Sequence, residues 1–204
     1  MLISVIFGQS IEAALQEIEQ VKDKVDAAEI RLDFLEEAAW SKLALLKERA
    51  GLPLVFTFRK KGQGGHREVA EVERLRLFEK ALALKPAFAD IEADGEKDWI
   101  AKIAKLHPEI QLIGSHHDFE KTPDELRGLL GSLRHPAFTF YKIAVHARST
   151  IDLLRLLVLA REDGKKVPLC CISLGLLGRT SRVLGPLVGN VSNYASPHDS
   201  MTFS

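Results

Sequence analysis

The chain has little cysteine and no excess of charge of either sign. Its only cysteines, Cys170 and Cys171, are neighbours in the sequence, and adjacent cysteines rarely bridge each other. We therefore expect no disulfide framework and a reducing cytoplasmic location. The 28 Lys and Arg residues balance 28 Asp and Glu residues. This balance predicts neither a nucleic-acid partner nor binding to an anionic membrane.

Long apolar runs and leader-like features are also lacking. No apolar run approaches the roughly 18 to 20 residues of a membrane-spanning helix. The first ten residues, "MLISVIFGQS", have no basic start and no small-residue cleavage site, so we expect no signal peptide. The glycine-containing segment 62–65, "GQGG", has the wrong spacing for a phosphate-binding loop. Five histidines are scattered without the spacing of a zinc site: His66, His107, His135, His146 and His198.

What the chain does contain is a regular alternation of β-rich and amphipathic helical segments. The predicted strands cover 2–7, 27–33, 53–59, 88–93, 111–118, 138–145, 167–174 and 187–195. The predicted helices cover 10–24, 36–49, 67–85, 96–106, 122–133, 149–163 and 178–186. The helix at 122–133 opens with "TPDE", which predicts Thr122 as N-cap and Glu125 as its capping-box partner.

This alternation predicts βαβ units and a parallel sheet. Eight strands in 204 residues favour a single α/β domain, a (β/α)8 TIM barrel spanning residues 1–204. The rival is a doubly wound open sheet, against which the missing glycine-rich fingerprint argues. The barrel comes up one helix short, because only "SPHDSMTFS" follows the eighth predicted strand.

Ionisable and polar residues gather at the predicted strand ends, where a parallel barrel carries its active site. They are Glu29, Arg31, Asp33, Arg59, Asp90, Glu92, Ser115, His116, His117, Asp118, Lys142, Arg179, Ser181 and Arg182. Strands of a barrel are buried on both faces, so polar residues within them are costly. Taken singly, most of these residues fit solvated or paired loop positions; taken together, they predict a pocket.

Lys142 differs from the others because it lies inside the apolar stretch "FTFYKIAVHA", at 138–147. Its position alone fits two interpretations, a catalytic amine or a buried ion pair with Glu29 or Glu92. A lysine desolvated beside cations such as Arg59 and Arg182 would be favoured as the free amine, which attacks ketones to form an imine. A nearby histidine would move protons, and arginines would bind a carboxylate. These residues favour Schiff-base lyase chemistry on a small anionic carbonyl compound.

The motifs "EIRLD", "FTFR", "GG", "DIE", "SHHDFEKTP", "YKIAV", "GLLGRTSR" and "GNVSNYA" occur in the order seen in a known family. In this respect the chain resembles the type I 3-dehydroquinate dehydratases of the shikimate pathway. The resemblance covers nearly the whole chain and implies a (β/α)8 barrel that needs no metal and no diffusible cofactor. It implies syn elimination of water from 3-dehydroquinate, giving 3-dehydroshikimate on the route to chorismate and aromatic amino acids.

The resemblance also implies roles for individual residues. Lys142 would form the imine with the C3 ketone, and His117 would remove the C2 proton and protonate the departing C1 hydroxyl. Arg182 would bind the substrate carboxylate. The ring hydroxyls would be held by Glu29, Arg31 and Arg59. Four further residues are secondary candidates for the site without an assigned role, namely Gln63, Asp90, Glu92 and Ser115. His116 occupies the variable position of its motif.

Two departures from the family pattern stand out. Gln63 occupies the position of a usual glutamate that hydrogen-bonds the catalytic histidine, and we expect a lower His117 pKa as a result. The chain stops at "DSMTFS", about where the family's lid loop begins, so the last helix and the lid are expected to be missing. Three explanations stay open: a truncated sequence, a longer natural fusion such as one with shikimate dehydrogenase, or a member that has lost its lid.

Two other functions remain alternatives to the dehydratase. One is another aldolase-type barrel, which would share the lysine but not "SHHDFEKTP" together with "TSR". The other is a non-catalytic ligand-binding or scaffold barrel of a fused shikimate-pathway protein, which Gln63 and the missing lid favour. Relatives of this size are often dimers, so a homodimer is the expected assembly.

Overall fold

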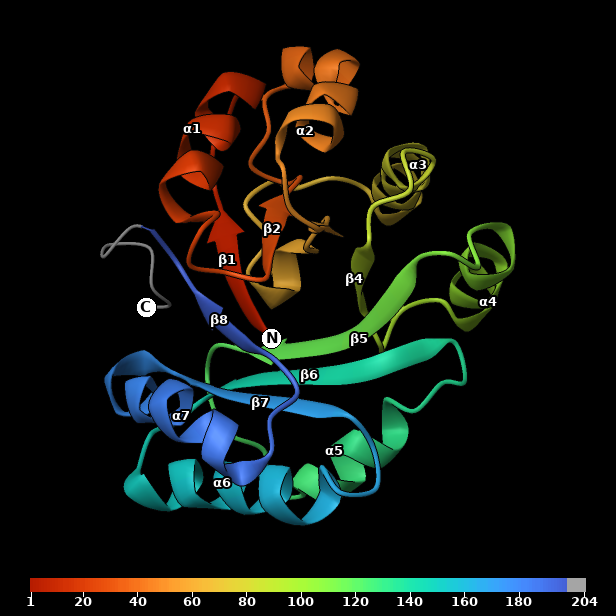
Figure 1. Ribbon diagram of the computed structural model, residues 1–204. Helices are drawn as coiled ribbons and strands as arrows, with labels where there is room; N and C mark the ends of the chain where they lie inside the picture. The colour runs from red at the N-terminus through yellow and green to blue at the C-terminus, as the bar shows by residue number, and fades with distance from the viewer. Residues whose placement is uncertain (198–204) are drawn as a thin grey trace.

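The computed structural model describes residues 1–197, which form one sheet of eight parallel strands surrounded by helices (Figure 1). The strands are β1 (Leu2–Ile6), β2 (Ala27–Arg31), β3 (Leu54–Thr57), β4 (Phe88–Glu92), β5 (Gln111–Asp118), β6 (Phe138–His146), β7 (Leu169–Leu174) and β8 (Asn193–Ala195). The helices are α1 (Ile11–Val21), η1 (Glu37–Lys42), α2 (Ala44–Arg49), η2 (Lys61–Gln63), α3 (Glu71–Leu82), α4 (Lys97–Leu106), α5 (Leu126–Ser132), α6 (Thr150–Asp163) and α7 (Gly175–Val188).

The strand order confirms the predicted barrel and excludes the doubly wound sheet. Each strand from β1 to β6 pairs in parallel with the strand that follows it in the sequence, and β8 pairs with β1. No ladder joins β7 to β8 within residues 1–197, where the Val191 amide donates to the Leu169 carbonyl at 3.0 Å instead. The result is a nearly closed barrel in which the carboxyl ends of all the strands lie at one rim.

Apolar residues divide into two layers, as a barrel requires. Residues such as Ile3, Val55 and Cys170 form the cluster inside the barrel. A second, larger cluster, which includes Phe56 and Cys171, lies between the strands and the helices. The two neighbouring cysteines therefore face opposite sides of β7 as small core residues, as predicted.

Two of the boundaries that differ from the sequence expectations have a clear structural reason. Helix α7 continues to Val188 and ends at Gly189, whose φ of 105° suits glycine, so β8 keeps only three residues. Thr122 does not cap a helix: its hydroxyl donates to the His146 carbonyl at 2.8 Å, and α5 begins only at Leu126. The Thr122 hydroxyl is thus hydrogen-bonded to the last residue of β6 rather than to a helix N-terminus.

The expected loss of the final helix and the lid loop concerns residues 198–204, which lie outside the described residues. Among residues 1–197, no helix combines the length and the apolar character needed to cross a bilayer. The cytoplasmic location stays a prediction.

Candidate active site

A cavity of about 330 Å³ opens among the carboxyl ends of the strands. Six of the predicted site residues line it, namely Glu29, Arg31, Arg59, Gln63, His117 and Lys142. Aromatic and aliphatic side chains complete the wall, among them Phe7, Phe34, Phe119, Ile172 and Tyr194. The cavity has the mixed lining typical of a small-molecule site, with a few polar groups in an apolar wall.

Lys142 lies on β6 and is 5% exposed. Its Nζ lies 3.1 Å from Asp90 Oδ2 and 3.5 Å from Glu29 Oε2. The amine lines the cavity and is also ion-paired, so the ion pair is observed and the catalytic interpretation stays a prediction. The predicted ion pair with Glu29 is confirmed. The alternative pair with Glu92 is wrong, because Glu92 forms ion pairs with Arg59 and Arg74 instead. The nearest charges are carboxylates rather than the cations we expected.

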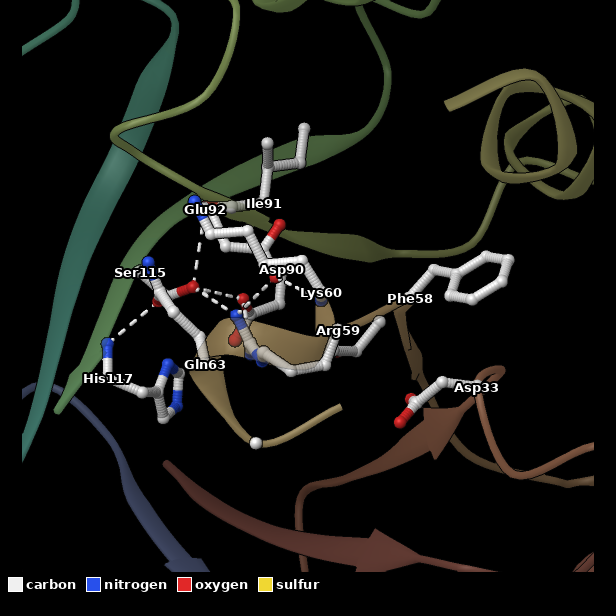
Figure 2. Close-up of polar contacts among 12 residues, drawn as sticks. Asp33, Phe58, Arg59, Lys60, Gln63, Asp90, Ile91, Glu92, Ser115 and His117 are labelled. Atoms are coloured by element: carbon white, nitrogen blue, oxygen red, sulfur yellow. Dashed lines mark hydrogen bonds and ion pairs between the residues drawn. The ribbon is translucent and has the colours of Figure 1, made fainter. Parts of the chain in front are cut away.

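Arg59, which follows β3, lies at the centre of a buried polar network (Figure 2). Its Nη2 donates to Asp90 Oδ1 at 2.7 Å, and its Nη1 donates to Ser115 Oγ at 2.7 Å and Glu92 Oε1 at 3.3 Å. Ser115 in turn donates to Asp90 at 2.5 Å. All four side chains are almost fully buried, so this network fixes the ends of β3, β4 and β5 against one another.

The network is balanced in charge. Burial alone would raise the pKa of Asp90, but the charges of Arg59 and Lys142 and the Ser115 hydroxyl together lower that pKa to about 2. Burial opposes the charge of Arg59 as well, and the carboxylates of Asp90 and Glu92 outweigh it and raise the arginine pKa. Removing any one of its charged members therefore leaves an uncompensated buried charge.

Asp90→Asn should destabilise the fold by about 3 kcal/mol, because Arg59 and Lys142 each lose a charged partner in a dry environment. The free energy of unfolding, measured with urea, checks this expectation. Asp23→Asn, at an exposed turn, is the matched control and should change stability by less than about 0.5 kcal/mol. Equal stability of the Asp90→Asn variant and the wild type would contradict the network's role.

Glu29 and Arg31 are fixed at the end of β2 by separate partners. Glu29 Oε1 accepts from the Thr57 hydroxyl at 2.7 Å, which leaves Oε2 facing Lys142. Arg31 makes a forked pair with Asp33, at 2.9 and 2.7 Å, and donates to the Gly64 carbonyl at 3.0 Å. Both residues line the cavity with their orientation already fixed.

His117 stands near the end of β5 with its ring stacked beside Phe119, at 6.3 Å between centroids. Its Nδ1 is buried and has no hydrogen-bond partner within residues 1–197. Burial, followed by the charges of Arg59 and Lys142, holds the pKa of His117 well below its usual range. The ring is therefore neutral near pH 7 and can accept a proton.

The lowered His117 pKa predicts how stability depends on pH. Below about pH 6.5 the histidine of the unfolded chain binds a proton that the folded ring does not bind. Stability should thus fall as pH decreases from about 6.5 toward the folded pKa, by up to about 1.4 kcal/mol per pH unit from this residue. His117→Asn should remove this part of the pH dependence in urea unfolding at pH 7 and pH 5. An unchanged slope would contradict the lowered pKa.

Gln63 bonds the backbone of His117, a contact that the sequence did not predict. Its side chain does not bond the His117 ring, although it occupies the position of a glutamate that does so in the family that the sequence resembles. Gln63 Oε1 instead accepts from the His117 main-chain N–H at 2.8 Å, while Nε2 donates to both Asp94 carboxylate oxygens, at 3.1 and 3.0 Å. The ring and the glutamine are thus connected only through the backbone.

Arg182 lies on α7, beside the cavity rather than in its lining. Its Nη1 donates to the Ser173 carbonyl near the end of β7 at 3.3 Å. Partial burial lowers the pKa of Arg182 to about 10. Its predicted contact with a substrate carboxylate stays a prediction.

Two site residues escaped the sequence reasoning. Tyr194 of β8 places its ring centroid 3.8 Å from Lys142 Nζ, close enough for a cation–π contact. Arg74 of α3 is 4% exposed, donates to the Phe58 carbonyl and lies 3.1 Å from Glu92 Oε2. The motif "GNVSNYA" contained the tyrosine, but nothing local distinguishes Arg74 from the exposed charges on its helix.

Among residues 1–197, no three His, Cys, Asp or Glu side chains are grouped so that they could hold a metal ion. The reactive groups in the cavity are the Lys142 amine and the His117 imidazole, surrounded by fixed carboxylates and guanidinium groups. A nearly closed ring of parallel strands with these groups at its carboxyl rim defines a (β/α)8-barrel enzyme.

Comparisons with known proteins narrow this class to one family. The family model for type I 3-dehydroquinase matches residues 3–201. The 3-dehydroquinate dehydratase of Methanosarcina barkeri is 33% identical over 209 residues, covering 96% of this chain and 84% of the relative. The solved structure of 3-dehydroquinate dehydratase from Enterococcus faecalis aligns with a TM-score of 0.86 and 28% identity, covering 95% of this chain and 87% of that chain. The chain belongs to the type I 3-dehydroquinase family, a family of hydro-lyases.

A solved structure of dehydroquinate dehydratase and shikimate dehydrogenase from S. pombe shares the fold, with a TM-score of 0.81 and 23% identity. The alignment covers 100% of this chain but only 41% of the S. pombe chain. The barrel therefore also occurs in that larger protein.

Proposed function

We propose that this chain dehydrates 3-dehydroquinate to 3-dehydroshikimate by syn elimination through an imine on Lys142. The product would feed the shikimate pathway toward chorismate and the aromatic amino acids. The observation that carries the proposal is the buried Lys142 amine in the same cavity as a neutral His117 imidazole. Family membership and the names of the relatives support the choice of substrate. The imine supplies the covalent chemistry, so the proposal includes no metal and no diffusible cofactor.

The reaction needs only these two groups to make and break bonds. The free amine of Lys142 adds to the C3 ketone, and the adduct loses water to give a protonated imine. The imine withdraws electrons from C2, and neutral His117 removes the C2 proton. The enamine expels the C1 hydroxyl, which leaves as water with the proton from His117. Hydrolysis of the imine releases the product and regenerates the amine, so one water is lost overall.

The surrounding residues would prepare the substrate and the amine. Glu29 and Asp90 hold the Lys142 ammonium in the resting site, so a proton must pass to a base such as His117 before the amine attacks. Arg31 and Arg59, with Glu29, would bind the ring hydroxyls. For Arg182 to bind the carboxylate, its guanidinium would have to reach the cavity from α7, where its Nη1 donates to the Ser173 carbonyl.

A continuous ultraviolet assay tests the proposal, because the product is a conjugated enone and the substrate is an isolated ketone. We expect an absorbance increase that requires the protein and saturates with 3-dehydroquinate. Binding of 3-dehydroquinate without conversion would contradict the proposal and favour a ligand-binding barrel. A homodimer, a fused or separate shikimate dehydrogenase partner and a cytoplasmic location belong to the same proposal.

A further inference from the structure

The end of β4 leaves one backbone group of β5 without a strand neighbour. The ladder between β4 and β5 ends at Glu92 and Ser115, and the last bond runs from the Ala93 amide to the Ser115 carbonyl at 2.8 Å. In a parallel sheet, every second residue directs its N–H and C=O toward the same neighbour. The His117 N–H therefore points to the side that β4 has already left.

Gln63 takes the place of the missing strand. Its carboxamide oxygen accepts from the His117 N–H at 2.8 Å, as Figure 2 shows. Its carboxamide nitrogen donates to both oxygens of Asp94, which follows β4, and Asp94 also accepts from Lys60 Nζ at 2.8 Å. Gln63 is 5% exposed, so both ends of the carboxamide are satisfied in a largely dry position.

We propose that Gln63 and Asp94 form a positioning pair, which holds the backbone of His117 and thereby directs its ring into the cavity for proton transfer. This inference rests on the proposed dehydration. The pair joins the loops after β3 and β4 to β5, at the one residue that must both accept and return a proton. Neither member touches the ring, so the pair acts through the main chain.

The chemistry of the two side chains explains why a glutamine fits here. An ionised glutamate can only accept hydrogen bonds. A glutamate at position 63 could still accept from the His117 N–H, but its second oxygen would lie about 3 Å from the Asp94 carboxylate, where like charges repel. Asp94 requires a donor from its neighbour, and the glutamine carboxamide supplies one donor face and one acceptor face.

Exchanging the two functional groups tests the pair. Gln63→Glu should lower kcat about tenfold, because repulsion from Asp94 displaces the residue that holds His117. Adding Asp94→Asn restores a donor opposite the new carboxylate, so the double variant should recover to within about threefold of the wild-type kcat. Asp94→Asn alone keeps an acceptor for Gln63 and should stay within about twofold. The matched control is Gln111→Glu, at the exposed start of β5, which should not change kcat.

A pH profile adds a measurement that a purely structural role would not move. Burial lowers the pKa of His117 the most. The charged and titratable groups that lower this pKa further are Arg59, Lys142, Arg31 and His116. The double variant brings a carboxylate nearer to the ring. The acid limb of kcat should therefore move to higher pH in the double variant than in the wild type.

Hydrogen exchange at the His117 amide tests the pair independently of turnover. The amide should be protected in the wild type and should exchange at least about tenfold faster in Gln63→Leu, which removes the acceptor. Equal exchange in these two proteins would overturn the proposal, even if the double variant fails to fold. A Gln63→Glu variant with wild-type kcat would also overturn the proposal. A folded double variant whose kcat does not recover would overturn it as well. A wild type without turnover would refute the proposed dehydration, while amide exchange would still decide whether the pair holds His117.

Discussion

Lys142→Met is expected to lower kcat for dehydration by at least about four orders of magnitude, because among residues 1–197 no other lysine lines the cavity and could form the imine. Lys142→Arg should lose as much activity, although it keeps the positive charge between Asp90 and Glu29. The pair of variants thus separates the nucleophile from the charge. Steady-state kinetics and urea unfolding of both variants measure the two effects.

Stability should respond differently from activity. Lys142→Met leaves the buried Glu29 carboxylate without its cation and should cost about 3 kcal/mol of unfolding free energy, and Lys142→Arg should cost less. The control is Lys165→Met, at an exposed turn, which should change neither quantity. Measurable turnover in a folded Lys142→Arg variant would show that the chemistry does not pass through this amine.

His117→Asn is expected to lower kcat about a thousandfold while leaving KM within a few fold, because the ring moves protons in the chemical steps. This variant keeps the main-chain N–H of residue 117, which donates a hydrogen bond to Gln63, so the end of β5 should stay in place. Imine formation should persist at a reduced rate, since Lys142 is untouched.

His116→Asn is the matched control for that variant. His116 neighbours His117 on β5 but does not line the cavity that contains Lys142, so its replacement should change kcat by less than about threefold. Similar losses in the two variants would mean that the ring of His117 has no special part in proton transfer. A larger loss in His116→Asn would move the acid–base role to that residue.

The barrel could be predicted because its signals are local. Alternating strand and helix patterns marked the first seven strands close to their observed positions, and polar residues at their ends pointed to one rim. β8 was harder: Leu187 and Val188 continue an apolar run that suits a strand as well as the last turn of α7. Gly189, which ends the helix, was the available signal for the true boundary.

The site was predictable in its members more than in its contacts. Lys142 stood out because a charge inside an apolar strand is costly. His117 and the rim arginines were found at the predicted strand ends, and the family motifs assigned their individual roles. The partner of Lys142 depended on which carboxylates the barrel closure brings near, and the sequence pattern does not encode that distance. For the same reason Arg74, on an ordinary amphipathic helix, and the backbone bond of Gln63 came only from the three-dimensional arrangement.

Borohydride trapping tests the central claim most directly. The protein is incubated with 3-dehydroquinate, borohydride is added, and intact mass and peptide mapping locate the adduct. We predict one reduced adduct per chain, on Lys142, which persists in His117→Asn and is absent from Lys142→Met. No adduct on the wild-type protein, or an adduct on any other lysine, would contradict an imine on Lys142 in this cavity.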